Sequence, residues 1–199
     1  FLSFIETLQK SDVFFTKTIS SSNIVKMFQK LNINLKGQVG LKVHSGEQGG
    51  KYSLRPSFLQ EIYDNTNGTF IECNTAYRGS RHSTDLHKQL LKDHGWLDNN
   101  RRTVIMDEDE THDISLSIRN YNMISENFVG QHLLEYDSSL VLAHCKGHTM
   151  GGFGGALKQL SIGFASQRGK TYIHSAGQTK DWTKMMEYAE ITSQEDFTA

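Results

Sequence analysis

Hydrophobic residues recur along the chain at helical spacing in some stretches and in short continuous runs in others. The stretch "SSNIVKMFQKLN" (21–32) follows a serine cap and places four apolar residues on one helical face: Ile24, Met27, Phe28 and Leu31. Further helices are predicted at 56–68, which opens on the chain's only proline, at 83–95 and at 127–136. Short apolar runs predict strands at 38–44, 69–73, 103–107, 113–118 and 138–145.

The alternation of strands and helices predicts an α/β layered fold with a largely parallel or mixed sheet and flanking helices. In sheets of this kind, ligands bind beyond the carboxyl ends of the strands. Side chains that can bind ligands lie at the carboxyl ends of four of the predicted strands: His44, Cys73 with Asn74, Asp107, and His144 with Cys145. A hydrophobic core does not need so many polar groups in these places, so we expect a functional site at this edge of the sheet.

Composition narrows the class of protein. The 199 residues suit a single α/β domain covering 1–199. A formal net charge of −1 gives no electrostatic reason to expect nucleic acid or an anionic membrane as a partner. Two cysteines do not make a disulfide framework, so we expect a reducing, cytoplasmic setting. No apolar run is long enough to cross a membrane.

Both ends of the chain suggest that it continues. The first residue is Phe1 rather than methionine, and the last residues, "TSQEDFTA", carry a loose capping pattern in Ser193 and Asp196 with no helix after it. We therefore expect the chain to be the amino-terminal part of a longer polypeptide, with the missing carboxyl-terminal segment or a ferredoxin-like domain as a partner.

The stretch "LAHCKGHTMGGFGGALKQL" (142–160) combines glycines with basic residues. A Walker loop needs glycine before its lysine and Ser or Thr after it, whereas Lys158 lies between Leu157 and Gln159. A dinucleotide fingerprint starts at Gly152 and Gly154 but then meets Leu157. Two interpretations stay open: a glycine turn that presents backbone N–H groups to an anion, and a tight turn with no ligand.

The same region contains side chains that bind metals. His144, Cys145 and His148 lie within five residues, and His174 follows in "KTYIHS". These are suitable ligands for Zn²⁺, Ni²⁺ or similar metals. Their spacing is less specific than a paired C-x-x-C motif, so histidines satisfied by ordinary hydrogen bonds remain the alternative.

Two shorter motifs suggest contacts with substrate or anion. "KVHSGEQGG" offers His44 and Glu47 as a base and a carboxylate near a strand end. "YRGSRHS" offers Arg78, Arg81 and His82 as a clamp for a carboxylate or phosphate. Solvated loops would explain both motifs equally well, and the acidic run 107–113 fits a solvated loop better than a Ca²⁺ site because it lacks the EF-hand glycine and distal glutamate.

Five segments between about residues 36 and 180 resemble the uncharacterised Fe–S centre proteins of the family with domain of unknown function 362. They are "GLKVHSGEQGG", "NTAYRGSRHST", "HGW", "HCKGHTMGGFGGALKQLSIG" and "QRGKTYIHSAG". The resemblance implies an Fe–S cluster whose cysteine ligands follow this region, outside the present chain. The chain departs from the family pattern at Gln159, where Asn is usual, and at Phe164, where Cys is frequent, and the latter removes one possible thiolate ligand.

The chain also resembles, more distantly, the nickel-pincer lactate racemases. His148, the turn "GGFGG", Lys158 ten residues on and His174 sixteen beyond that reproduce their spacing. The resemblance implies that His148 is an acid/base, that Lys158 carries the cofactor covalently and that His174 binds nickel. The second acid/base histidine of these enzymes has its nearest counterpart in His82.

These observations support three hypotheses. The first is a metal- or Fe–S-associated, redox-linked protein of unknown reaction, and the second is a racemase-like enzyme acting on a small 2-hydroxy acid. The third is a non-catalytic module that binds a small anion or a partner. The predicted site comprises acid/base residues His148 and His82, cofactor contacts Lys158, Gly151, Gly152, Gly154, Gly155, His44 and Arg81, and metal ligands His174, His144 and Cys145.

Overall fold

The computed structural model describes residues 12–109, 111–148 and 151–189. Its centre is a four-stranded sheet of parallel neighbours in the order β3-β2-β1-β6. The strands are β1 (Val39–Lys42), β2 (Thr69–Glu72), β3 (Thr103–Ile105) and β6 (Ser138–Val141). The predicted α/β fold with a largely parallel sheet is confirmed. Each of these strands is one to four residues shorter than the run that predicted it, because the last residues of each run turn away into the site.

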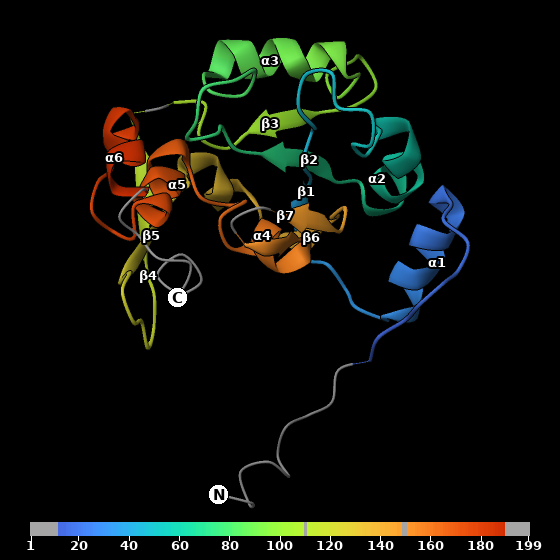
Figure 1. The fold of residues 1–199 in the computed structure, drawn as a ribbon. Coiled ribbons are helices and arrows are strands. Elements are labelled where there is room, and N and C mark those ends of the chain that lie inside the picture. Colours follow the sequence, from blue (N-terminus) through green and yellow to red (C-terminus); the bar gives the residue numbers. More distant parts are fainter. Residues whose placement is uncertain (1–11, 110, 149–150, 190–199) are drawn as a thin grey trace, which may run out of the picture.

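The helices lie around this sheet (Figure 1), with α3 along the β3 side, α1 and α2 together at one end and α5 and α6 at the other. Their bounds are α1 (Ser21–Lys30), α2 (Gln60–Thr66), α3 (Thr84–Asp93), α4 (Ala156–Leu160), α5 (Gln167–His174) and α6 (Met185–Ala189). Within the described ranges, the short 3₁₀ helices are η2 (Pro56–Leu59), η3 (Gln131–Glu135) and η4 (Trp182–Lys184). None of the helices in the described ranges is long and apolar enough to cross a membrane.

Sequence signals explain where several helices begin and end. The Ser20 hydroxyl accepts a hydrogen bond from the Asn23 N–H at 3.2 Å, which confirms the predicted serine cap of α1. Pro56 opens η2, which continues into α2. That helix ends at Asn67, whose left-handed φ of +46° makes it the C-cap one residue before the predicted Gly68.

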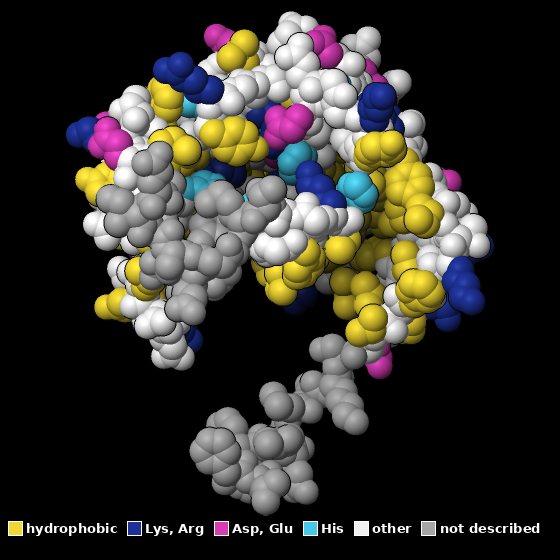
Figure 2. Space-filling view, viewed as in Figure 1, with side chains coloured by type: hydrophobic (Ala, Val, Ile, Leu, Met, Phe, Trp, Pro, Cys, Tyr) yellow, Lys and Arg dark blue, Asp and Glu magenta, His cyan; other side chains and the backbone are white. Residues whose placement is uncertain are grey.

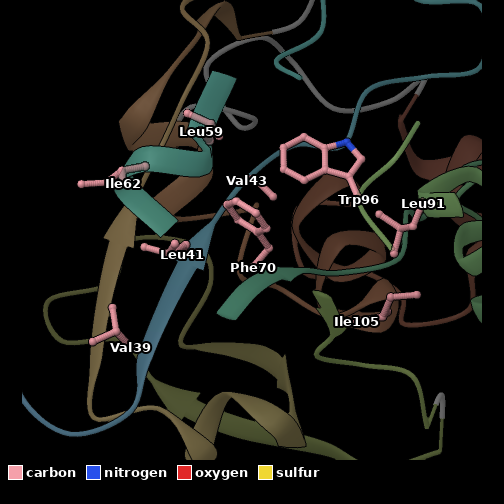
Figure 3. Close-up of a cluster of buried hydrophobic side chains, with 9 residues drawn as sticks. All are labelled: Val39, Leu41, Val43, Leu59, Ile62, Phe70, Leu91, Trp96 and Ile105. Carbon is pink, nitrogen blue, oxygen red and sulfur yellow. The ribbon is translucent and has the colours of Figure 1, made fainter. Parts of the chain in front are cut away.

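The main core lies between the sheet and the helices that cover it (Figure 3). It contains Val39, Leu41, Val43, Leu59, Ile62, Phe70, Leu91, Trp96 and Ile105. Phe70 of β2 meets Trp96 edge to face, with ring centroids 5.1 Å apart. The indole of Trp96 donates to the Ser45 carbonyl at 3.1 Å, so the core also fixes the loop that follows β1.

The predicted helix at 127–136 is wrong. Its first half is β5 (Glu126–Gly130), which pairs antiparallel with β4 (Asp113–Ser117), and its second half is η3. Phe128 and Val129 favour a strand, and an added Cβ at Gly130 would lie 2.2 Å from the Met106 carbonyl oxygen. The predicted strand at 113–118 therefore belongs to a hairpin outside the main sheet.

The glycine-rich stretch folds differently from the predicted strand-to-helix turn. The strand predicted at 138–145 ends at Val141, and a second hairpin follows, formed by β7 (Lys146–His148) and β8 (Gly152–Gly154). Gly152 has a left-handed φ of +70°, which a side chain would strain. Only then does α4 begin, with Gly155 as its N-cap. The capping pattern at Ser193 and Asp196 lies outside the described residues.

Candidate functional site

The strand order identifies one crevice at the carboxyl edge of the sheet. From β1 the chain adds β2 and β3 on one side, and β6 pairs with the other side of β1. A reversal of this kind leaves a crevice outside the strand ends, where ligands of open α/β sheets bind. The segments that follow β1 and β6 carry the predicted His44 and the hairpin β7–β8.

A buried carboxylate organises the end of β2. Glu72 accepts hydrogen bonds from Arg81 Nη1 at 2.7 Å, from the Ser45 N–H at 3.0 Å and from His87 Nε2 at 3.2 Å. Burial opposes its charge, but Arg81 and His87 outweigh that effect and hold the Glu72 pKa well below its usual range. Glu72 is therefore a fixed negative charge inside the protein.

Arg81 connects this carboxylate to the predicted residues His44 and Glu47. It is 4% exposed, and burial alone would lower its pKa, but the carboxylates of Glu72 and Glu47 raise it above the usual value. Its Nη2 contacts a carboxylate oxygen of Glu47 and lies 3.3 Å from His44 Nε2. Burial and the Arg81 charge lower the His44 pKa to about 3, so the imidazole is neutral at physiological pH.

Lys42, the last residue of β1, links the sheet to α4. Its amine is buried and donates to the Val43 carbonyl at 2.7 Å and to Gln159 Oε1 at 2.8 Å. Burial lowers its pKa to about 8, partly offset by the nearby Glu72. Because Gln159 follows Lys158 directly, this contact helps to set the position of the helical turn that carries Lys158.

The hairpin and α4 bring His148 and Lys158 into contact. The Gly151 N–H donates to His148 Nδ1 at 3.0 Å, so the proton of a neutral ring lies on Nε2. Lys158 Nζ contacts that Nε2. An uncharged lysine amine can accept the Nε2 proton in a hydrogen bond, whereas an ammonium group cannot.

Burial and a neighbouring cation make the Lys158 amine easier to deprotonate. Burial, assisted by the charge of Lys146, lowers the Lys158 pKa to about 8. Burial lowers the His174 pKa to about 4, and the charges of Lys158, Lys170 and His148 act in the same direction. The predicted trio His148, Lys158 and His174 is thus brought within electrostatic reach as one amine and two neutral imidazoles.

The polar groups after β2 and β3 brace the helix that carries His174. The buried Asp107 accepts from the N–H groups of Asn74 at 2.9 Å and Gln167, the first residue of α5, at 2.7 Å. Lys170 of α5 donates to the Asn74 carbonyl at 2.6 Å and to the Ala165 carbonyl at 2.7 Å. Asn74 and Asp107, expected among the strand-end ligand groups, therefore hold α5 against the sheet.

The two cysteines lie in opposite surroundings. Cys73 is buried, its sulfur is 3.5 Å from the Phe164 carbonyl oxygen, and burial raises its pKa to about 12, so it stays a thiol. Cys145 is exposed, as is the neighbouring His144. Within the residues that the structure describes, no three His, Cys, Asp or Glu side chains are arranged to hold a metal ion.

The remaining predicted residues have local structural contacts. The His82 ring packs edge to face on Trp182, with centroids 4.4 Å apart, and Gln167 Nε2 lies 3.3 Å from His82 Nδ1. Gly154 is buried in β8. Gly151 fixes the tautomer of His148 through its N–H, and the other glycines of this stretch shape the hairpin β7–β8.

Sequence reasoning missed four polar residues of this site: the buried Lys42, Glu72 and His87 and the half-buried Lys170. A signal for two of them was present, because Lys42 and Glu72 interrupt otherwise apolar strands that are buried on both faces. A charge in such a strand needs a partner. His87 and Lys170 lie on helices, where the sequence pattern does not distinguish a solvated side chain from one that points into the site.

Comparison with known proteins places these observations in a family. The family model described as "Domain of unknown function (DUF362)" matches residues 39–198. None of the curated proteins matches the chain. A solved structure, the lactate racemase apoprotein from Thermoanaerobacterium thermosaccharolyticum, is similar with a TM-score of 0.51 and 17% sequence identity.

The racemase match covers 86% of this chain and 47% of the racemase chain, so the present chain spans about half the length of that protein. At this level of identity the match establishes a common fold only. The family model, in contrast, matches most of the chain, including β1, the hairpin β7–β8, Lys158 and His174. The chain therefore belongs to the DUF362 family, whose domain has no established function.

Proposed function

We propose that the chain forms part of an enzyme that binds a small organic anion and transfers protons at His148 and His82, with Lys158 as the attachment point for a cofactor. The single observation that carries this proposal is the contact between the Lys158 amine and His148 Nε2, with the opposite ring nitrogen held by Gly151. An amine with a pKa of about 8 is a far better nucleophile near neutral pH than an ordinary lysine.

Positive charge supports an anionic substrate. Burial is the main cause of the lowered His44 pKa, and the charges of Arg81, Lys146 and Lys42 add to it. Burial likewise lowers the His174 pKa, and the charges of Lys158 and Lys170 add to it. Figure 2 shows histidine side chains beside basic side chains in a hollow at the centre of one face, with an acidic side chain next to them. An anion bound there would be attracted by these cations, while the neutral imidazoles could accept its proton.

The substrate class follows from the likeness to the racemases. The spacing of His148, Lys158 and His174, together with the fold shared with a lactate racemase apoprotein, favours a small 2-hydroxy acid. In this assignment His148 is one acid/base and His82 the second. The aromatic contact of His82 with Trp182 would hold its ring in one orientation.

The neutral imidazole of His174 also suits a cofactor that contains a metal ion. Metals bind the neutral form of imidazole, and the low pKa of His174 keeps that form available. In our proposal His174 would bind the metal, Lys158 would hold an organic part covalently, and the group would act as the electron acceptor of the reaction. His144 and Cys145 would be accessible as further ligands.

A metal- or Fe–S-associated redox protein is the second candidate function, and the neutral His174 imidazole is the observation that favours it. Ni and Zn suit nitrogen donors of this kind. An Fe–S cluster would need cysteines from outside this chain, because Cys73 is a buried thiol.

The test combines two measurements on protein purified anaerobically from its native source. Mass spectrometry of the Lys158 peptide should find a covalent adduct, and elemental analysis should find a metal that is lost when His174 is replaced by Ala. An unmodified Lys158 peptide from a preparation with activity on 2-hydroxy acids would rule out the covalent cofactor. Unmodified Lys158 without metal uptake would leave the non-catalytic anion-binding module as the alternative, and Lys158→Ala should then weaken anion binding.

A further inference from the structure

In its contacts with the described residues, Arg81 uses both terminal nitrogens of its guanidinium group, Nη1 and Nη2, but not Nε. Nη1 donates to Glu72 Oε1 at 2.7 Å, and Nη2 contacts Glu47 Oε1. The third donor, Nε, is buried and has no hydrogen-bond partner among the residues that the structure describes. Leaving a charged, buried donor unpaired is unfavourable, so the Nε edge of Arg81 requires an explanation.

The geometry of a guanidinium group identifies what the edge is suited to bind. Nε–H and one N–H of Nη2 are parallel and point out of the same edge, and they match the two oxygens of a carboxylate. Glu47 reaches only Nη2 with one oxygen. A carboxylate that entered from the direction of Glu47 could contact both donors.

His44 adds a third donor beside the same edge. The Gly46 N–H donates to His44 Nδ1 at 3.0 Å, so the proton of the neutral ring lies on Nε2. That Nε2 faces Arg81 Nη2 at 3.3 Å, so two donors meet with no acceptor between them. An anionic oxygen placed near both would accept from each and remove this mismatch.

The Glu47 side chain, unlike that of Glu72, is placed so that it can move away from Arg81. Its side chain is 44% exposed, whereas that of Glu72 is 3% exposed. The loop that carries it has left-handed glycines on both sides, Gly46 with φ +91° and Gly49 with φ +74°. Its second contact is a hydrogen bond from the exposed Tyr77 hydroxyl at 3.2 Å. The Glu47 carboxylate can therefore exchange its contacts for water by turning outward, whereas the buried Glu72 carboxylate cannot.

Open space adjoins the two loops that meet here. A surface groove of about 340 Å³ is bordered by Gln48, next to Glu47, and by Gly79 and Ser80, which directly precede Arg81. The groove therefore lies next to the loops that carry Glu47 and Arg81.

We propose that the Nε/Nη2 edge of Arg81, together with His44 Nε2, is a subsite for the carboxylate group of the ligand, and that Glu47 is an internal carboxylate that fills it in the ligand's absence. The inference rests on the proposed function and deepens it, because it assigns the chemical group that positions the anion. Glu47 then sets the affinity by competing with the ligand, and Glu72 holds Arg81 in place throughout.

The test measures binding of L-lactate and acetate to the purified protein by isothermal titration calorimetry. Glu47→Ala removes the competitor and should tighten the binding of both carboxylates by about tenfold. Glu61→Gln, which changes an exposed glutamate of α2, is the matched control and should leave binding unchanged. Adding Arg81→Lys to Glu47→Ala should abolish the gain, because an ammonium group has no bidentate edge.

Equal carboxylate affinities for Glu47→Ala and the unaltered protein would overturn the proposal. So would a gain for inorganic phosphate without one for carboxylates, or a gain that survives Arg81→Lys in protein shown to be folded by its cooperative unfolding. His148→Asn separates this proposal from the proposed function: carboxylate binding and the effect of Glu47→Ala should persist in it while proton transfer is lost. An unmodified Lys158 would contradict the proposed function and leave the Glu47 result standing.

Discussion

The two parts of the site differ in the protonation states that they stabilise: one lies at the end of β2, and the other at the hairpin β7–β8, α4 and α5. At the end of β2, Glu72 and Arg81 are buried as a fully charged pair, each raising the stability of the other's ionised form. In the second part, which comprises the hairpin β7–β8, α4 and α5, burial and neighbouring cations lower the pKa values of Lys158 and His174 and so favour deprotonation.

The difference separates structural support from reactivity. A charge held between buried partners keeps one protonation state over a wide pH range, which suits a residue that orients a ligand. A base whose pKa lies near the working pH can gain and lose a proton, which suits chemistry. Lys42 lies between the two regions, since Glu72 acts on its pKa and Gln159 of α4 accepts its hydrogen bond.

Removing the central carboxylate should have the largest effect. Glu72→Gln removes the buried countercharge of Lys42 and leaves Arg81 with only the half-exposed Glu47, so it should lower the free energy of unfolding by about 3–5 kcal/mol, as measured by urea denaturation. Glu61→Gln on the exposed face of α2 should change it by less than about 0.5 kcal/mol. A loss below about 1 kcal/mol for Glu72→Gln would show that the β2 region does not depend on its charge pair.

A glycine substitution tests how firmly α5 holds His174 in the second region. A Cβ at Gly169 would lie 2.1 Å from the Phe128 carbonyl oxygen, so Gly169→Ala must push α5 away from β5. We expect a loss of about 2–3 kcal/mol in the thermal or urea unfolding of this variant. Gly147→Ala is the control, because an added Cβ there meets nothing within 4 Å. Similar losses in both variants would contradict the close contact between α5 and β5.

The neutral histidines predict a smaller, pH-dependent effect. His44 and His174 have folded pKa values of about 3 and about 4, below the unfolded value of 6.5. The unfolded chain therefore binds more protons between these values, and stability is lost as the pH falls through this window. Between pH 6.5 and 4.5 each of the two histidines should contribute a loss of about 2 kcal/mol, and the share of His174 should be absent in His174→Asn. A stability that stays level in this range would mean that these histidines are not buried as neutral bases.

More of the fold than of the site could be predicted from the sequence. Short, largely apolar runs such as "TFIEC" identified the parallel strands, because strands buried on both faces need mostly apolar side chains. The region 127–136 was assigned to the wrong element because its apolar residues also fit helical spacing. Its strand pairing depends on β4 and on the close approach of Gly130 to Met106, and neither contact is local in sequence.

For the site, spacing identified residues but not their states. The prediction brought His148, Lys158 and His174 together, and the structure places them within electrostatic reach. It did not reveal that Gly151 fixes the His148 tautomer or that Glu47 contacts Arg81, because both depend on loop geometry. The pKa shifts arise from burial, which is a property of the folded chain as a whole.

The most direct test of the account is the titration of the Lys158 amine. Competitive acetylation between pH 6 and 11, quantified by peptide mass spectrometry on protein without an adduct at this residue, reports its pKa, with the exposed Lys51 as internal reference. The account predicts a midpoint at a pH of about 8. A midpoint near 10.4, the value of an unperturbed lysine, would contradict the claim that burial and Lys146 lower the pKa of the Lys158 amine beside His148.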